Sequence, residues 1–168
     1  MTSATNSWKQ IGSVFAWRYL ENTRNFPGWH LAFDPAGLNS LEELLRRMVD
    51  SETGTLRSVC VAPPTSMVLR IASNRRAAVV AAQRMRVVKV EPSLAWSIAT
   101  TESEIVISAG ADQLSAFADW LRTDRKSFDT TFGKNPPIWY WGTVAPMVEA
   151  PPNKPLKLSV GRRRPPAA

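Results

Sequence analysis

Two residues whose side chains often act as base and nucleophile occur once each in this chain, His30 and Cys60. A cysteine nucleophile needs a neighbouring base, and Asp34 is close enough in sequence to orient an imidazole at position 30. Neither residue lies in a motif typical of cysteine enzymes. Cys60 stands between Val59 and Val61, so we expect a small buried side chain. We expect His30 to hydrogen-bond at the surface beside Asp34, which argues against a catalytic dyad.

Metal and nucleotide sites have little support in the sequence. A structural zinc site needs several Cys or His ligands, and the chain has one of each. The spacing of four aspartates does not match a calcium loop and favours a solvated acidic face; these are Asp112, Asp119, Asp124 and Asp129. The eight glycines form no phosphate-binding motif. We therefore predict no metal, no cofactor and no catalytic residue.

An enzyme that uses carboxylate or hydroxyl chemistry stays open as a third alternative, because such chemistry can leave no signature in a linear sequence. Glu102 and Glu104 are one such pair, but they flank a predicted hairpin turn. Water at a turn would leave their acidity ordinary, which suits general acid and base catalysis poorly. The sequence therefore favours a binding protein over an enzyme.

The positive charge of the chain is concentrated in two segments. Residues 53–90 contain seven basic residues and no acidic one, and residues 151–168 contain five basic residues and no acidic one. Such segments can bind phosphates by releasing counterions. The candidate contact residues are Arg70, Arg75, Arg76, Arg84, Arg86, Arg162, Arg163 and Arg164. A solvated face and a solubilising tail are the simpler interpretation.

Aromatic residues are plentiful, with seven tryptophans in 168 residues. In the run Trp139, Tyr140 and Trp141, strand alternation sends the two indoles to one face and the phenol to the other. If both faces are covered, these residues belong to the core, as large aromatics usually do. If one face is open, all three are candidate contacts for a partner protein.

Two segments have the periodicity of amphipathic helices. Residues 40–50 place Leu41, Leu44, Leu45 and Met48 on one face, and residues 111–123 place apolar side chains similarly. Ser40 followed by Glu43 forms a capping box that predicts the first turn of the earlier helix. The pairs Glu42 with Arg46 and Glu43 with Arg47 have the favourable i, i+4 order.

Alternation of apolar and polar side chains predicts several short strands. They are expected over residues 13–20, 29–33, 57–61, 67–72, 87–90, 94–98, 104–108 and 138–141. Residues 8–20 also fit a helix, and residues 75–83 fit either state. The segments 94–98 and 104–108 flank turn-forming residues and make the clearest hairpin.

These elements predict one α+β domain over residues 8–150, with an antiparallel sheet of about five to seven strands and two or three helices packed on one face. Residues 1–7 are expected to be a flexible lead, and the Pro-rich and Arg-rich residues 151–168 a basic flexible tail. Antiparallel pairing is expected because strands of parallel sheets usually contain continuous apolar runs.

The leading functional prediction is a small non-catalytic protein that binds another protein, as an inhibitor, immunity protein or adaptor does. The alternative is a nucleic-acid binder that uses residues 53–90 and the tail. We expect a cytoplasmic location and no membrane insertion, because no apolar run approaches the length of a bilayer span and no secretory signal begins the chain. The oligomeric state cannot be predicted from these patterns.

Overall fold

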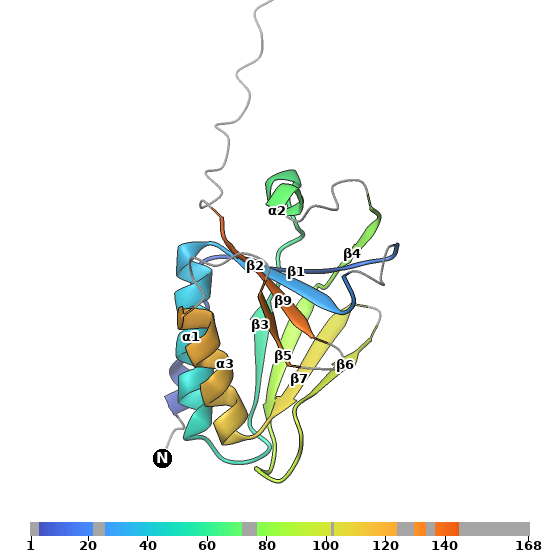
Figure 1. The fold of residues 1–168 in the computed structure, drawn as a ribbon. Coiled ribbons are helices and arrows are strands. Elements are labelled where there is room, and N and C mark those ends of the chain that lie inside the picture. The colour runs from blue at the N-terminus through green and yellow to red at the C-terminus, as the bar shows by residue number, and fades with distance from the viewer. Residues whose placement is uncertain are drawn as a thin grey trace, which may run out of the picture.

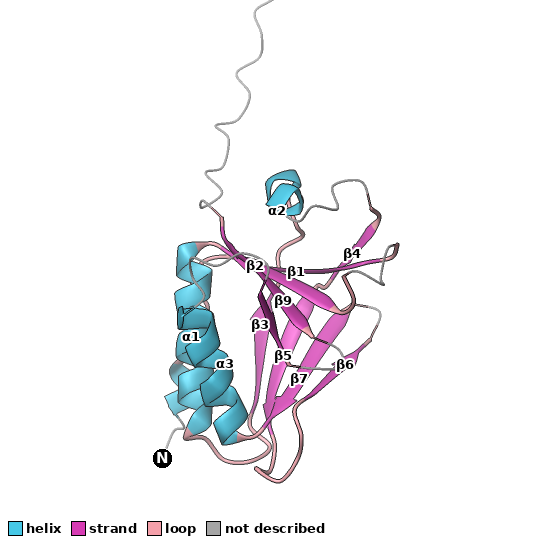
Figure 2. Ribbon diagram, viewed as in Figure 1, coloured by secondary structure: helices cyan, strands magenta, loops and turns pink. Residues whose placement is uncertain are grey.

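The computed structural model describes residues 4–21, 26–71, 77–101, 103–123, 130–133 and 137–144. The helical elements are η1 (Ala4–Ser7), α1 (Pro35–Val49), α2 (Ser66–Ile71) and α3 (Ala111–Thr123). The strands are β1 (Val14–Tyr19), β2 (Trp29–Phe33), β3 (Leu56–Cys60), β4 (Val79–Ala81), β5 (Arg84–Lys89), β6 (Ser97–Thr100), β7 (Glu104–Ala109), β8 (Thr130–Phe132) and β9 (Ile138–Thr143). Figure 2 shows the same view coloured by secondary structure.

The strands form two sheets. Sheet A has the order β4-β1-β2-β9-β8, and sheet B has the order β3-β5-β7-β6. The α+β class is confirmed, but the single antiparallel sheet is wrong, because β2 pairs in parallel with β9 and β5 in parallel with β7. In β5 and β7 buried side chains alternate with partly exposed ones. Alternation of apolar and polar side chains therefore indicates that one face of a sheet is uncovered. It does not indicate whether neighbouring strands run parallel or antiparallel.

The main core lies between the two sheets and the helices α1 and α3. It is built from one face of each sheet, with Leu31 and Phe33 of sheet A, Val87 and Ile107 of sheet B, and the apolar stripe of α1. Figure 1 shows α1 and α3 side by side along one side of the molecule. Both amphipathic helices predicted from periodicity are confirmed, and their apolar faces supply this core.

An ionic network joins the two long helices at the surface. The guanidinium of Arg46 binds Glu42 at 3.1 Å on its own helix and Asp119 of α3 at 2.9 Å. The hydrogen bond from Arg46 lowers the pKa of Asp119. Both predicted i, i+4 pairs of α1 are present, since Arg47 also binds Glu43. The network fixes the contact between α1 and α3 from the solvent side.

Helix α1 begins six residues earlier than the capping box at Ser40 predicted. Asp34 is the N-cap, its Oδ1 accepts a bond from the Gly37 amide at 2.6 Å, and Pro35 fills the first helical position. The prediction was wrong because an aspartate followed by proline starts a helix as well as a serine does. Ser40 lies inside the helix, where its hydroxyl accepts a bond from the Ile11 amide at 3.0 Å.

Helix α2 occupies the segment for which a strand over residues 67–72 was predicted. Thr65 starts the helix, because its hydroxyl and carbonyl accept bonds from the amides of Val68 and Leu69. Val68 is 1 % exposed and packs on the face of sheet A opposite the main core. The prediction that all helices pack on one face is therefore wrong. The predicted strand is also wrong, because an alternating apolar run this short fits one buried helical turn equally well.

The segment before β1 packs against sheet B. Within the expected flexible lead, Ala4–Ser7 form a short 3₁₀ helix with Thr5 1 % exposed. The guanidinium of Arg57 in β3 donates to the Thr5 carbonyl at 2.9 Å. None of the helices in the described ranges combines the length and the apolar character needed to cross a bilayer.

Candidate functional site

The aromatic candidates of β9 belong mainly to the core. Tyr140 is fully buried in the main core, and Trp141 is 3 % exposed on the opposite face of sheet A. Trp139 is half-buried, and its indole N–H donates to the Pro27 carbonyl at 2.8 Å. Both faces of this strand are covered, so these residues offer a partner at most the edge of Trp139.

His30 sits at the centre of an aromatic cluster on the same face of sheet A. Its ring stacks with Trp17, Trp139 and Trp141 at centroid distances of 5.6, 5.9 and 5.8 Å, and Tyr19 meets it edge-on at 4.7 Å. The β9 bulge beside Gly142, whose φ of 82° suits glycine, lies next to this cluster. His30 is therefore fully buried, and the expected surface position is wrong.

The hydrogen bonds of His30 fix it as a neutral ring. The indole N–H of Trp141 donates to Nδ1 at 2.8 Å, so the proton of the imidazole resides on Nε2, which lies 3.4 Å from the Phe26 carbonyl. Burial lowers the pKa of His30 to about 4. With its acceptor nitrogen occupied by an indole, His30 is a packing residue without a free lone pair for catalysis.

The structure does not bring together His30 and Cys60, considered above as a catalytic dyad, or place Asp34 beside His30. Cys60 is exposed on β3 of sheet B, whereas His30 is buried in sheet A. The expected burial of Cys60 is thus wrong, because Val59 rather than Cys60 faces the core. Asp34 bonds the amides of Ser13 and Gly37 and orients no imidazole.

Of the basic candidates, Arg84 and Arg86 have described side chains. Both lie on β5 and share one carboxylate oxygen of Glu104, at 3.3 and 3.2 Å. This pairing also occupies the carboxylate considered above for acid and base chemistry. Arg70 belongs to α2 with its side chain outside the described part, and Arg75, Arg76, Arg162, Arg163 and Arg164 lie wholly outside the described residues.

Arg84 and Arg86 belong to a flat surface that we call the outer face of sheet B. Strand register places its side chains in rows that run across all four strands. The members are Leu56, Ser58, Cys60, Arg84, Arg86, Val88, Ser97, Ala99, Glu104, Val106 and Ser108. Their neighbours along each strand, such as Met85 and Ile105, point into the core and are buried.

The outer face of sheet B has no described helix or strand over it. Figure 1 shows α1 and α3 on the other side of this sheet, and α2 lies against sheet A. Leu56 is 41 % exposed, and Val88 and Val106 are partly exposed beside Ala99. The face thus combines partly exposed apolar side chains with small serines and one charged cluster.

A signal for this surface is present in the sequence, but a count of charged residues does not reveal it. The alternation in β5 and β7 predicts one polar and one apolar face, but Val88 and Val106 occupy the polar side. An aliphatic residue in the solvent-facing phase of a strand was the available clue. The aromatic residues of β9, by contrast, pack mainly in the interior.

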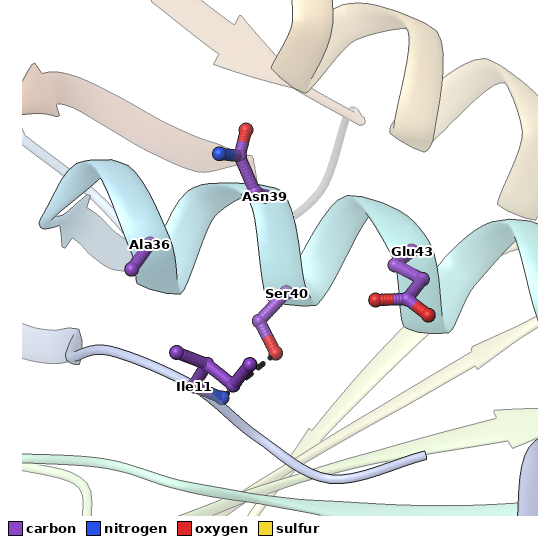
Figure 3. Close-up of a pocket in the computed structure, with 5 residues that line it drawn as sticks. All are labelled: Ile11, Ala36, Asn39, Ser40 and Glu43. Atoms are coloured by element: carbon purple, nitrogen blue, oxygen red, sulfur yellow. Dashed lines mark hydrogen bonds between the residues drawn. The ribbon is translucent and has the colours of Figure 1, made fainter. Parts of the chain in front are cut away.

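A small pocket lies beside the start of α1 (Figure 3). It has a volume of about 190 Å³ and is lined by Ile11, Ala36, Asn39, Ser40 and Glu43. The Ser40 hydroxyl already accepts the Ile11 amide, and Glu43 is bound to Arg47. Ligand sites are usually larger and hold several free polar groups, so this pocket makes a poor small-molecule site.

Within the described ranges, no group of three or more His, Cys, Asp or Glu side chains is arranged to hold a metal ion. Asp119, one of the four aspartates considered for hard cations, is bound to Arg46 and Arg122. No family model matches the sequence, and a comparison with curated proteins found no match. The outer face of sheet B is therefore the candidate site that rests on structure alone.

Proposed function

We propose that this protein acts by binding another protein, and that the outer face of sheet B is the contact surface. The observation that carries the proposal is that Leu56 is exposed, and Val88 and Val106 partly exposed, on a sheet face that no described element covers. A non-catalytic role of the inhibitor, immunity or adaptor type is the function we infer. A cytoplasmic location would suit the exposed thiol of Cys60, which a reducing compartment keeps free.

Nucleic acid is a less suitable partner for this face. Arg84 and Arg86 are both neutralised in part by Glu104, which weakens the attraction for phosphates. Single-stranded nucleic acids also bind on aromatic side chains that stack with bases, and the outer face of sheet B has none. A protein surface with apolar and hydrogen-bonding groups fits better.

The proposal is tested by comparing capture of a partner from native lysate by wild type and by Val106→Arg. The substitution places a long charged side chain at the centre of the face, where it blocks close contact without entering the core. Ala116→Arg on the exposed side of α3 is the matched control. We expect a captured protein that Val106→Arg loses at least about tenfold and Ala116→Arg retains, with nuclease treatment making no difference.

Two results would contradict this function. Capture unchanged in Val106→Arg would show that the partner binds elsewhere. Capture that disappears after nuclease treatment would show that a nucleic acid bridges the two proteins and would favour the alternative. Both variants should unfold within a few degrees of wild type, because neither position is in the core.

A further inference from the structure

Strand β6 presents an open backbone edge. The Thr101 amide bonds the Glu104 carbonyl at 3.0 Å, so residues 101 and 104 form a hydrogen-bonded pair of the β6–β7 ladder. Such pairs alternate along an antiparallel ladder, which directs the N–H and C=O groups of Ile98 and Thr100 away from β7. No hydrogen bond joins these four groups to the described part of the chain.

The opposite edge of sheet B, along β3, is partly covered by side chains of the chain itself. The side-chain amide of Gln10 accepts from the Cys60 amide at 2.7 Å and donates to its carbonyl at 2.9 Å, as an added strand would. The Leu56 carbonyl accepts from Arg57. Side chains thus cover both ends of the β3 edge, whereas among the described residues no side chain bonds the outward backbone groups of β6. Unprotected edges are templates for another strand.

A cation lies next to the open edge. The indole N–H of Trp29 donates to the Thr100 hydroxyl at 3.0 Å, and the guanidinium of Arg18 stacks over Trp29 at 5.6 Å from the ring centroid. Arg18 makes no ion pair with any described acid, and its Nε is buried without a hydrogen-bond partner. An acidic group from outside the chain would complete this arrangement.

We infer that β6 binds an extended acidic segment of another protein as an additional strand of sheet B. The backbone of the segment pairs with Ile98 and Thr100, and a carboxylate on the side chain opposite Thr100 binds Arg18. Ser97 and Ala99 are small and uncharged, so they admit a neighbouring strand on the outer side. The edge is distinct from the outer face of sheet B, so each surface is tested separately.

The test uses three eight-residue peptides of alternating Thr and Val, with a central Glu, Gln or Lys. Amide hydrogen exchange of the wild-type protein is measured by NMR with each peptide in excess. We expect protection of the Ile98 and Thr100 amides, and about fivefold tighter binding of the Glu peptide than of the Gln peptide. Arg18→Gln should remove the preference for Glu while leaving the backbone protection in place.

A proline at position 100 supplies the second arm of the experiment. Thr100→Pro removes one outward N–H at a site where an edge strand tolerates proline, and it should weaken all three peptides. Thr100→Val keeps the backbone and controls for the lost hydroxyl. Unchanged exchange of Ile98 and Thr100 at saturating peptide would overturn the inference. So would equal binding of the Glu and Lys peptides, or protection that rises with protein concentration alone, since a second copy would then occupy the edge.

Discussion

His30 shows how a single residue type can be misjudged from sequence. A lone histidine that shares a strand face with Asp34 resembles a surface group, but the tryptophans that bury it come from β1 and β9, far apart in the chain. Alternation within β2 gave the face on which His30 lies, and it could not show that this face would be covered. What covers a strand is decided by distant segments, which local periodicity does not report.

The burial of His30 predicts an acid-sensitive stability. The unfolded imidazole titrates near 6.5 and the folded one near 4, so the unfolded chain binds more protons between these pH values. The contribution of neutral His30 to the free energy of unfolding is complete above about pH 6.5. It declines as the pH falls towards 4 and is lost below that pH. The two pKa values correspond to about 3 kcal/mol of unfolding free energy.

An NMR titration of the only histidine measures this directly, with an expected pKa of about 4. His30→Asn is the control, because its amide oxygen can still accept the Trp141 indole N–H but does not titrate. Between pH 7 and 4 the variant should lose about 3 kcal/mol less unfolding free energy than wild type. A histidine that titrates near 6.5 would show that the aromatic cluster is open to water.

At the scale of elements, the start of α1 depends on a close approach between Gly12 and Gly37. A Cβ on Gly37 would lie 2.1 Å from the Ser13 carbonyl oxygen, and one on Gly12 would lie 2.2 Å from the Gly37 amide nitrogen. Asp34 bridges the same two segments by accepting from Ser13 and Gly37. Neither glycine stands in a sequence motif, so this contact could not be predicted before the two segments were placed.

Gly37→Ala therefore provides a test in which two effects have opposite sign. In a helix without a close neighbour, the change from glycine to alanine would raise the free energy of unfolding by up to about 1 kcal/mol. Here the clash with the Ser13 carbonyl should instead lower the free energy of unfolding by about 3 kcal/mol or more. Urea denaturation measures the difference. Gly54→Ala is the control, since Gly54 has a φ of 87° and open space around it, and it should cost about 1 kcal/mol. Equal losses in the two variants would refute the close approach.

The long amphipathic helices and most strands could be predicted, because each carries its periodicity within a dozen residues. Helix α2 could not, since a six-residue apolar segment has the same pattern in either state. Strand direction could not either, because β2 and β9 are brought together from positions more than a hundred residues apart. The limit in each case is information that is not local.

At the scale of the whole molecule, the two sheets differ in how they are used. Sheet A is covered on both sides, by the main core and by the cluster around His30 and α2. Within the described residues, sheet B is covered on one side and has partly exposed apolar side chains on the other. The tryptophans of sheet A pack within these two clusters, and the outer face of sheet B and the β6 edge are the surfaces that we propose for recognition.

The most direct test of protein binding through sheet B is hydrogen–deuterium exchange on the captured complex, compared with the free protein. The account predicts slower exchange in the complex over residues 84–88, 97–100 and 104–108, with α1 and α3 unchanged. Slower exchange confined to α1, α3 or the pocket beside Ile11 would contradict it, because the partner would then bind the side of the molecule opposite the exposed sheet.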